Sequence, residues 1–452
     1  MIFYCFLSFL LFLAIPSKMQ KIQAFKLTLF RVPRPKKEIA SMEQLPSELV
    51  SNILSRLPAK DLVKCKSVCK SWFNLISDPY FATNYYAFYN NLKHQQEPLF
   101  VIRRPFLSSL KTCISLLSSS VNHPHVSSEL LNPPSEYNSD RQYWTEIMGP
   151  CNGIYYLKGS PNVLMNPSLR QLKALPASNL STSSPQKTYS LTNYAGFGFD
   201  PKTNDYKVVV IKDLWFEKAE RQNGHWTAEL YSLNSNSWRN LDAALPLPFE
   251  IWGSSQVCTY VNNCCHWWGF VDECGEKQDV VLAFDMVTEV FRKIKVPRIR
   301  DSSGEASATL TPFNTTSTLG VIVHPVRGDV KGFDVWVMKD HCDEGSWMKQ
   351  YSVGHREVIY KLVGFYGSHH FGSIEDNEGL VHNSKQIKDL QVYGMCESLR
   401  ATRYMESLVS LHRGNEFSGQ FVSCSSVPDL LPNQPRNYLV SLSQKMKTFL
   451  KM

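Results

Sequence analysis

The 452-residue sequence lacks the motifs that mark most enzyme active sites. It contains no H-E-x-x-H, no P-loop and no G-x-S-x-G, the spacings that set metal ligands, phosphate-binding backbone or a nucleophile in place. Gly196-x-Gly198 is not followed by a third glycine at the start of a helix. Cys265 and His266 are adjacent, and neighbours on a strand point to opposite faces, so they cannot act as nucleophile and base. We therefore expect no catalytic residue, no metal and no cofactor.

The sequence also lacks a cysteine framework and a membrane-spanning run. None of its 12 cysteines has C-x-x-C spacing, and a chain of this size can bury a core without disulfides. This predicts reduced thiols and a location in the cytoplasm, with the nucleus as an additional site. The apolar run Ile2–Ile15 is too short to span a bilayer comfortably. It is either a secretory signal or anchor, or an extension upstream of a working start at Met42. We favour the extension and expect no membrane association.

Charge of one sign is scarce outside a single segment. The formal net charge is +8, and residues 18–41 alone carry +6 of it. The rest of the chain is therefore nearly neutral, which argues against a nucleic-acid partner. Hydrophobic residues make up 43% and charged residues 19%, so most of the chain can fold around a core. Aromatic residues at 12%, with 25 Pro and 22 Gly, favour a β-rich, turn-rich body.

Residues 42–83 have the periodicity of a small helical module. Apolar residues recur at i, i+4 and i+8 between Pro46 and Pro58, which is typical of one helix face. Pro46 suits the first turn, and Pro58 ends the helix because it lacks an amide proton. Two more helices are expected, at 59–64 and at about 66–78. The third should turn these residues inward: Val68, Cys69, Trp72, Leu75 and Ile76. Cys65 and Cys69 have helical spacing, but no nearby His or Cys pair completes a metal site, so we interpret both as core thiols.

The same residues resemble an F-box at matching spacings. The resemblance rests on Leu45-Pro46, Glu48-Leu49, Ile53-Leu54, Arg56-Leu57-Pro58, Leu62 and Val68-Cys69-Lys70-Ser71-Trp72. It implies docking on the Skp-type adaptor, which joins a receptor to the cullin and RING subunits of a ubiquitin ligase. The docking surface and its support would be supplied by Leu45, Pro46, Leu49, Ile53, Leu54, Leu57, Pro58, Leu62 and Val63. The alternative is a plain helical cap on the β domain.

The remainder reads as a repeated β architecture. We expect a first strand at 98–103 within a linker at 84–145, then a β-propeller-like domain at 146–412 and a flexible tail at 413–452. Sequence segments with a strand–turn–strand pattern recur at unequal spacing. This favours radially repeated sheets but leaves the number of blades open. Short polar residues mark the turns: Asn166, Asn234 and Asp285 are expected at equivalent positions, and Asp200-x-x-x-Asn204-Asp205 is expected to be a hairpin turn. Trp252, Trp267 and Trp268 are interpreted as buried blade aromatics.

These segments resemble the kelch-like F-box-associated domain of plant F-box proteins. They include Gly149–Gly153, Gly196–Val208, Tyr231–Trp238 and Phe284–Phe291. The segment Glu397–His412 resembles the C-terminal signature of S-locus F-box and S-locus-F-box-like proteins. The resemblance implies a non-catalytic substrate receptor of a Skp–cullin–F-box ubiquitin ligase, with a non-self S-RNase as leading target in pollen self-incompatibility. The alternatives are a receptor for another plant regulatory or defence protein, and a β-propeller binding module outside any ligase.

Overall fold

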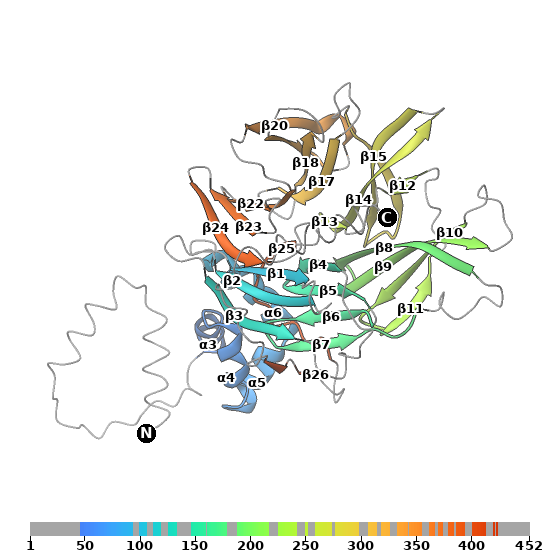
Figure 1. Cartoon of the computed structure of the whole chain (residues 1–452). Helices are drawn as coiled ribbons and strands as arrows, with labels where there is room; N and C mark the ends of the chain where they lie inside the picture. Colours follow the sequence, from blue (N-terminus) through green and yellow to red (C-terminus); the bar gives the residue numbers. More distant parts are fainter. Residues whose placement is uncertain are drawn as a thin grey trace, which may run out of the picture.

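The fold is a helical unit set against a ring of antiparallel sheets (Figure 1). The computed structural model describes residues 46–93, 99–105, 112–118, 125–132, 146–159, 161–178, 188–216, 225–241, 249–251, 258–273, 276–297, 306–313, 318–325, 332–341, 343–354, 361–366, 369–373, 378–383, 386–393, 400–412, 419–420 and 422–423. None of the helices within these ranges has the length and apolar character that a bilayer-spanning helix requires.

Residues 46–93 form the helical head. Its helices are α3 (Ser47–Leu54), α4 (Ala59–Cys65), α5 (Lys70–Ser77) and α6 (Pro79–Lys93). Pro46 and Pro58 stand immediately before α3 and α4, where a missing amide proton costs nothing. The helices enclose one apolar cluster, which includes Leu54, Leu62 and Trp72. The predicted start of the second helix and the inward direction of Trp72 and Ile76 are confirmed.

Two features of the head differ from the sequence-based expectation. The helical module was expected to end at residue 83, yet α6 continues to Lys93 and buries Phe81, Ala82 and Tyr85. The third helix begins at Lys70 and not near Lys66, because residues 66–68 form a turn. Cys69 is consequently the exposed residue before α5, and only Cys65 is a buried thiol. The prediction that both are core thiols was therefore wrong for Cys69.

The strands of the described residues form six sheets, which we number as blades in chain order. Blade 1 contains β1 (Leu99–Pro105), β2 (Thr112–Ser118), β3 (His125–Asn132), β25 (Arg400–Arg403) and β27 (Val422–Ser423); blade 2 contains β4 (Glu146–Cys151), β5 (Ile154–Lys158), β6 (Val163–Asn166), β7 (Gln171–Ala174) and β26 (Gly419–Gln420); blade 3 contains β8 (Thr188–Asp200), β9 (Asp205–Phe216), β10 (His225–Ser232) and β11 (Ser237–Asn240).

The other three blades follow the same antiparallel plan. Blade 4 contains β12 (Glu250–Ile251), β13 (Thr259–Val261), β14 (Cys264–Glu273), β15 (Glu276–Asp285) and β16 (Phe291–Lys295); blade 5 contains β17 (Ala306–Pro312), β18 (Leu319–Pro325), β19 (Gly332–Met338), the 3-10 turn η6 (Glu344–Ser346) and β20 (Trp347–Gly354); blade 6 contains β21 (Lys361–Tyr366), β22 (His369–Ser373), β23 (Glu378–Asn383) and β24 (Gln386–Tyr393). The buried Trp267 and Trp268 of β14 are blade aromatics as expected, and Trp252 lies outside the described residues.

The blades close into a ring through contacts between one strand of each blade and the next. Strand β4 contacts β8, β8 contacts β14, β14 contacts β17, β17 contacts β21, β21 contacts β25, and β25 contacts β4. Because β25 pairs with β1, the last inner strand of the chain completes the first blade. Closure into a ring covers the faces of the terminal blades, and the radial arrangement leaves only short strand edges at the outside of each blade. The expected propeller architecture is therefore confirmed.

The segments outside the expected propeller boundaries also belong to it. The stretch 84–145, expected to be one strand and a linker, contains the end of α6 and the three paired strands β1, β2 and β3. The expected tail after residue 412 contains β26, which pairs with β7, and β27, which pairs with β3. The expectation for the tail was incomplete because β26 and β27 pair with strands far away in the sequence, where local patterns carry no signal.

Short polar residues hold the hairpin turns, largely as expected. Asn166 Oδ1 accepts from the amide of Ser168 at 2.9 Å, and Asp285 Oδ1 accepts from the amide of Val287 at 2.8 Å. The third turn differs. Ser232, and not Asn234, occupies the equivalent strand-end position, and its Oγ accepts from the amide of Ser235. The side chain of Asn234 instead donates to the backbone of the preceding hairpin.

Blades 3 and 4 interlock where β8 carries two glycines. Trp267 Nε1 donates to the carbonyl oxygen of Ala195 at 3.1 Å, and the Tyr260 hydroxyl donates to that of Phe199 at 2.8 Å. A Cβ atom at Gly198 would lie 2.5 Å from Cε2 of Tyr260, and one at Gly196 would lie 2.7 Å from Cζ2 of Trp267. The Gly-x-Gly pattern therefore admits the aromatic rings of the next blade.

Replacement of Gly198 by alanine is expected to destabilise the propeller by about 1–3 kcal/mol, the usual cost of forcing extra atoms into a packed core. The added methyl group must displace the Tyr260 ring, which is also held by its hydrogen bond. Urea unfolding of the purified chain measures the effect. Gly345→Ala is the matched control, because its Cβ would meet no atom closer than 3.4 Å. Equal stability of the two variants would contradict this interlock.

Candidate functional site

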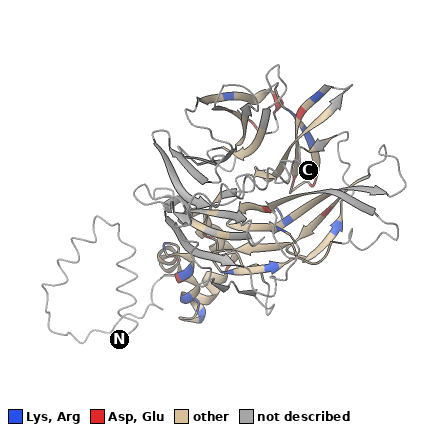
Figure 2. Ribbon diagram, in the orientation of Figure 1, with Lys and Arg blue, Asp and Glu red and all other residues tan. Residues whose placement is uncertain are grey.

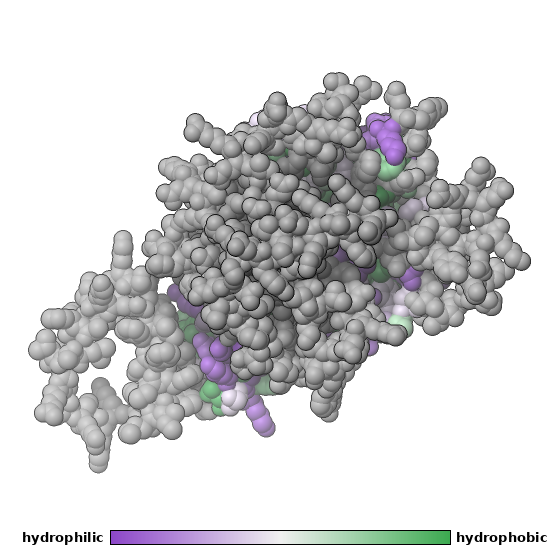
Figure 3. Space-filling model, viewed as in Figure 1, coloured by the Kyte–Doolittle hydropathy of each residue, from purple (hydrophilic) through white to green (hydrophobic). Residues whose placement is uncertain are grey.

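Exposed apolar side chains gather on the helical head. Among the described residues, six large hydrophobic side chains are exposed, and five of them belong to the head: Leu49, Val63, Phe73, Tyr80 and Phe88. Leu49 is 51% exposed, Phe73 52% and Tyr80 75%. Figure 3 shows hydrophobic and hydrophilic residues side by side on the head beneath the propeller. A single exposed leucine is ordinary, but this concentration on one small module makes the head the candidate interaction surface.

The structure divides the residues proposed for adaptor docking into two groups. Pro46, Leu49 and Val63 are exposed, and Ile53 and Pro58 are half-buried. The buried members of the set support the surface from beneath: Leu54, Leu57 and Leu62. The remaining member, Leu45, lies outside the described residues.

The sequence reasoning missed three of the exposed residues of the head. Phe73 follows Trp72 directly, and the same helical period that turns Trp72 inward turns Phe73 outward. Tyr80 and Phe88 belong to α6, most of which lay beyond the expected end of the module. A search for aromatic residues off the inward face would have identified Phe73. The α6 residues carried no such signal, because the periodicity of that helix is weaker.

Basic residues lie on the same helices as these apolar residues (Figure 2), and we call them the basic rim. Residues 46–93 contain six Lys or Arg residues and three Asp or Glu residues, a net charge of +3: the basic ones are Arg56, Lys60, Lys64, Lys66, Lys70 and Lys93. An acidic partner would gain association rate and specificity from such a rim. Among them, Arg56 lies over the ring of Phe88, 5.9 Å from its centroid.

The cysteines and histidines of the described residues form no reactive pair. Burial raises the pKa of the Cys65 thiol to about 11, so this thiol is protonated and inert at neutral pH. Cys265 lies beside Cys258, and burial raises its pKa as well. The ring of His266 points away from these thiols: its Nδ1 contacts the carbonyl oxygen of Thr259, and its Nε2 lies 3.3 Å from Nε2 of His341. Burial lowers the pKa of His266 to about 3. No described group of three or more His, Cys, Asp or Glu residues could hold a metal ion.

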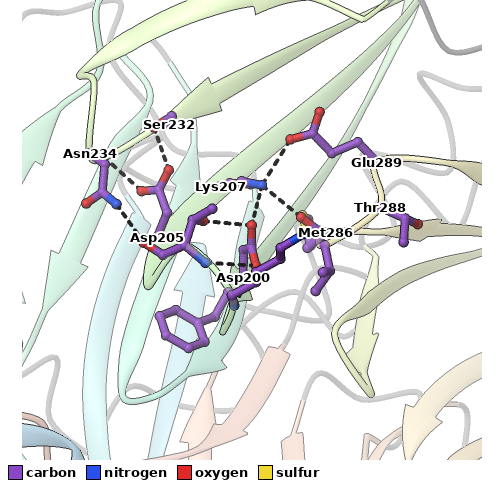
Figure 4. Close-up of polar contacts among 12 residues, drawn as sticks. Asp200, Asp205, Lys207, Ser232, Asn234, Met286, Thr288 and Glu289 are labelled. Carbon is purple, nitrogen blue, oxygen red and sulfur yellow. Dashed lines mark hydrogen bonds and ion pairs between the residues drawn. The ribbon is translucent and has the colours of Figure 1, made fainter.

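The most highly charged cluster of the propeller joins two blades (Figure 4). Lys207 Nζ of β9 lies 2.7 Å from Asp200 Oδ2, 2.9 Å from the carbonyl oxygen of Met286 and 3.0 Å from Glu289 Oε1. Glu289 also pairs with Arg239. Asp200 closes the hairpin turn at residues 201–204, as expected from the sequence, by accepting from the Lys202 amide. Every charge has a partner, so the cluster is a structural bridge between blades 3 and 4.

Three comparisons bear on this architecture. Residues 106–432 match the family model of the F-box associated beta propeller domain, and residues 42–87 match the F-box-like model. An F-box/kelch-repeat protein of Arabidopsis thaliana is 26% identical over 70% of this chain and 81% of its own length. The F-box protein CPR1 of the same plant is 25% identical over 69% of this chain and 73% of its own length.

Another F-box protein of Arabidopsis thaliana is 29% identical over 57% of this chain and 66% of its own length. Among solved structures, an ulvan lyase matches with a TM-score of 0.36 and 11% identity over 69% of this chain and 77% of its own, too low to support any inference. The propeller match spans more than half of the chain and follows directly after the F-box-like head. The chain therefore belongs to the family of F-box proteins that carry an F-box associated β-propeller domain.

Proposed function

We propose that the chain is the substrate-recognition subunit of a Skp–cullin–F-box ubiquitin ligase. The observation that carries this proposal is the concentration of exposed apolar residues on the F-box head, with Leu49 and Val63 among them. The head docks on the Skp-type adaptor through that surface, and the basic rim favours an acidic adaptor face. The chain forms no covalent bond itself. It raises the effective concentration of a bound target beside the ubiquitin-loaded enzyme.

We place target recognition at the ends of the blades that point away from the head. In an antiparallel blade the first and third connections lie at one end and the second lies at the other. The turns at 152–153 and 167–170 lie at the head end, since Gly153 adjoins Met405, which contacts Tyr86, and Leu169 packs against the apolar cluster of the head. The strand ends at Phe216 and His225 in blade 3 therefore lie at the opposite end. Connections between rigid strands are where binding residues concentrate.

The target class that the resemblance suggests is a non-self S-RNase in pollen. Its support is the similarity of residues 397–412 to the S-locus signature. Binding of purified S-RNases to the immobilised chain, with unrelated basic ribonucleases as controls, tests this part of the proposal. Binding to S-RNases alone would support it, whereas equal binding to the controls or none at all would overturn it without affecting the ligase assignment.

The ligase assignment predicts a specific loss when the exposed surface is made acidic. The double variant Leu49→Asp and Val63→Asp should fold, because both side chains are exposed, yet lose the adaptor and with it the cullin. The measurement is affinity purification of the tagged chain from plant cells, followed by identification of the co-purified subunits. Asn74→Asp is the matched control, an exposed substitution on α5. Retention of cullin by the double variant would contradict the proposed docking surface.

A further inference from the structure

Residues 404–411 follow the last inner strand, β25, and form a segment without regular secondary structure that we call the strap. The strap lies between the helical head and blade 2. A segment without ladder pairing must satisfy its backbone polar groups elsewhere. Here the partners come from both neighbours, the head on one side and the turns of blade 2 on the other.

On the head side, the strap supplies the N-terminal cap that α4 lacks. Pro58 precedes α4 and provides no side-chain cap. Glu406 Oε2 accepts from the amide of Ala59 at 2.6 Å and from the hydroxyl of Tyr85 at 3.0 Å. A carboxylate at a helix N-terminus satisfies a free amide and complements the helix dipole. Leu408 adds an apolar contact, because it is buried within the core of the head.

On the propeller side, blade 2 fixes the strap backbone at several points. Asn166 Nδ2 donates to the carbonyl oxygens of Ser407 and Val409, at 3.2 and 2.8 Å. The Leu411 amide donates to Gln171 Oε1 at 2.9 Å, and the Leu411 side chain is buried in the propeller core. Gly153 leaves room for the strap, since a Cβ there would lie 2.6 Å from the Ser407 Cβ.

We propose that the strap makes the head and the propeller one rigid body, and that Glu406 is the positioning residue that sets their relative orientation. The proposal rests on the proposed function for its consequence: a rigid receptor presents every bound target to the ligase in one geometry, which is what transfer by proximity requires. Leu169 of the turn at 167–170 also packs against the apolar cluster of the head, and the strap adds the buried Leu408 and the two hydrogen bonds of Glu406 to this contact.

The test measures the distance between the two parts directly. Spin labels carried by unnatural residues at Asn74 on α5 and Lys293 on β16, both exposed, avoid the exposed thiol of Cys69. The full chain should give one narrow distance distribution. Glu406→Ala should broaden it, whereas Glu406→Gln, which keeps an acceptor oxygen, should restore it. Ser410→Ala, an exposed strap position, should leave it narrow.

The outcome does not depend on adaptor binding, so it separates this proposal from the previous one. A distribution in Glu406→Ala as narrow as that of the parent would overturn the positioning role. Should Glu406→Ala fail to fold, Tyr85→Phe removes a head-side donor to the same carboxylate and should give a partial broadening; an unchanged width there would equally overturn the role. Adaptor affinity of the folded variants should change far less than in the Leu49→Asp and Val63→Asp double variant, because Glu406 contacts the backbone amide of Ala59 and the hydroxyl of Tyr85.

Discussion

Replacement of Lys207 by methionine is expected to lower the free energy of unfolding by about 3–5 kcal/mol, the usual result of removing one partner from a buried ion pair. The Lys207 side chain is 7% exposed and that of Asp200 only 1%. Methionine fills much of the same volume but leaves the Asp200 carboxylate buried without its cation. Glu289 keeps Arg239 as a partner, so the loss falls mainly on Asp200. Denaturant unfolding followed by tryptophan fluorescence measures it.

The same bridge predicts how stability depends on pH. Burial opposes ionisation of Asp200, but hydrogen bonds from Lys207, Thr203 and the Lys202 amide hold its pKa below the ordinary value. A depressed carboxyl pKa contributes stability that is present above the unfolded value of about 3.9 and is lost as the pH falls through the folded value. In the parent, acid should therefore remove stability in this range. The Lys207→Met variant should lose less stability than the parent over the same fall in pH, because it already lacks the cation that favours the ionised carboxylate of Asp200.

The control for this prediction is Lys349→Met. Lys349 pairs with Asp334 at 2.9 Å, but the two side chains are 42% and 37% exposed to solvent, and surface pairs contribute about 0–1 kcal/mol. A loss in Lys207→Met no larger than that in Lys349→Met would contradict the role of the buried bridge.

Replacement of Leu54 by alanine is expected to destabilise the head by about 2–5 kcal/mol, the usual cost of truncating a fully buried leucine. Leu54 has no exposed surface and belongs to the cluster that joins α3 to α4 and α5. A head of this size has little stability in reserve. Adaptor binding should therefore fall because the helices that carry the docking surface unfold. Hydrogen exchange of the amides in α3, α4 and α5 measures the opening.

The variant Leu49→Ala distinguishes residues that stabilise the head from residues that contact the adaptor. Its side chain is half-exposed, so hydrogen exchange of the head should stay near that of the parent while adaptor affinity falls. If Leu54→Ala and Leu49→Ala changed hydrogen exchange equally, the division between a buried support and an exposed surface would be wrong.

Local patterns predicted much of this fold because local physics determines it. The period of the apolar residues identified α3 and α4, and the Asx turns identified the hairpins at Asn166 and Asp285. Features set by distant partners were missed. Glu406 caps α4 although it lies 347 residues from Ala59 in the sequence. No local pattern near either residue predicts that contact.

The strap also bears on how the C-terminal signature is interpreted. Residues 404–411 belong to the segment 397–412 on which the proposal of an S-RNase target rests, and here they contact the head and blade 2 of their own chain. A segment occupied by internal contacts is suited to holding the architecture together. Target choice is therefore better sought at the blade ends away from the head, whose strand ends include Phe216 and His225.

The central claim, that the exposed surface of the head docks on a Skp-type adaptor, is tested most directly by calorimetric titration of the purified adaptor into the full chain. The account predicts saturable binding with one adaptor per chain. It also predicts that Leu49→Asp with Val63→Asp abolishes the binding while circular dichroism stays unchanged. A folded parent chain that binds no adaptor would contradict the account, and the propeller would then be a binding module outside any ligase.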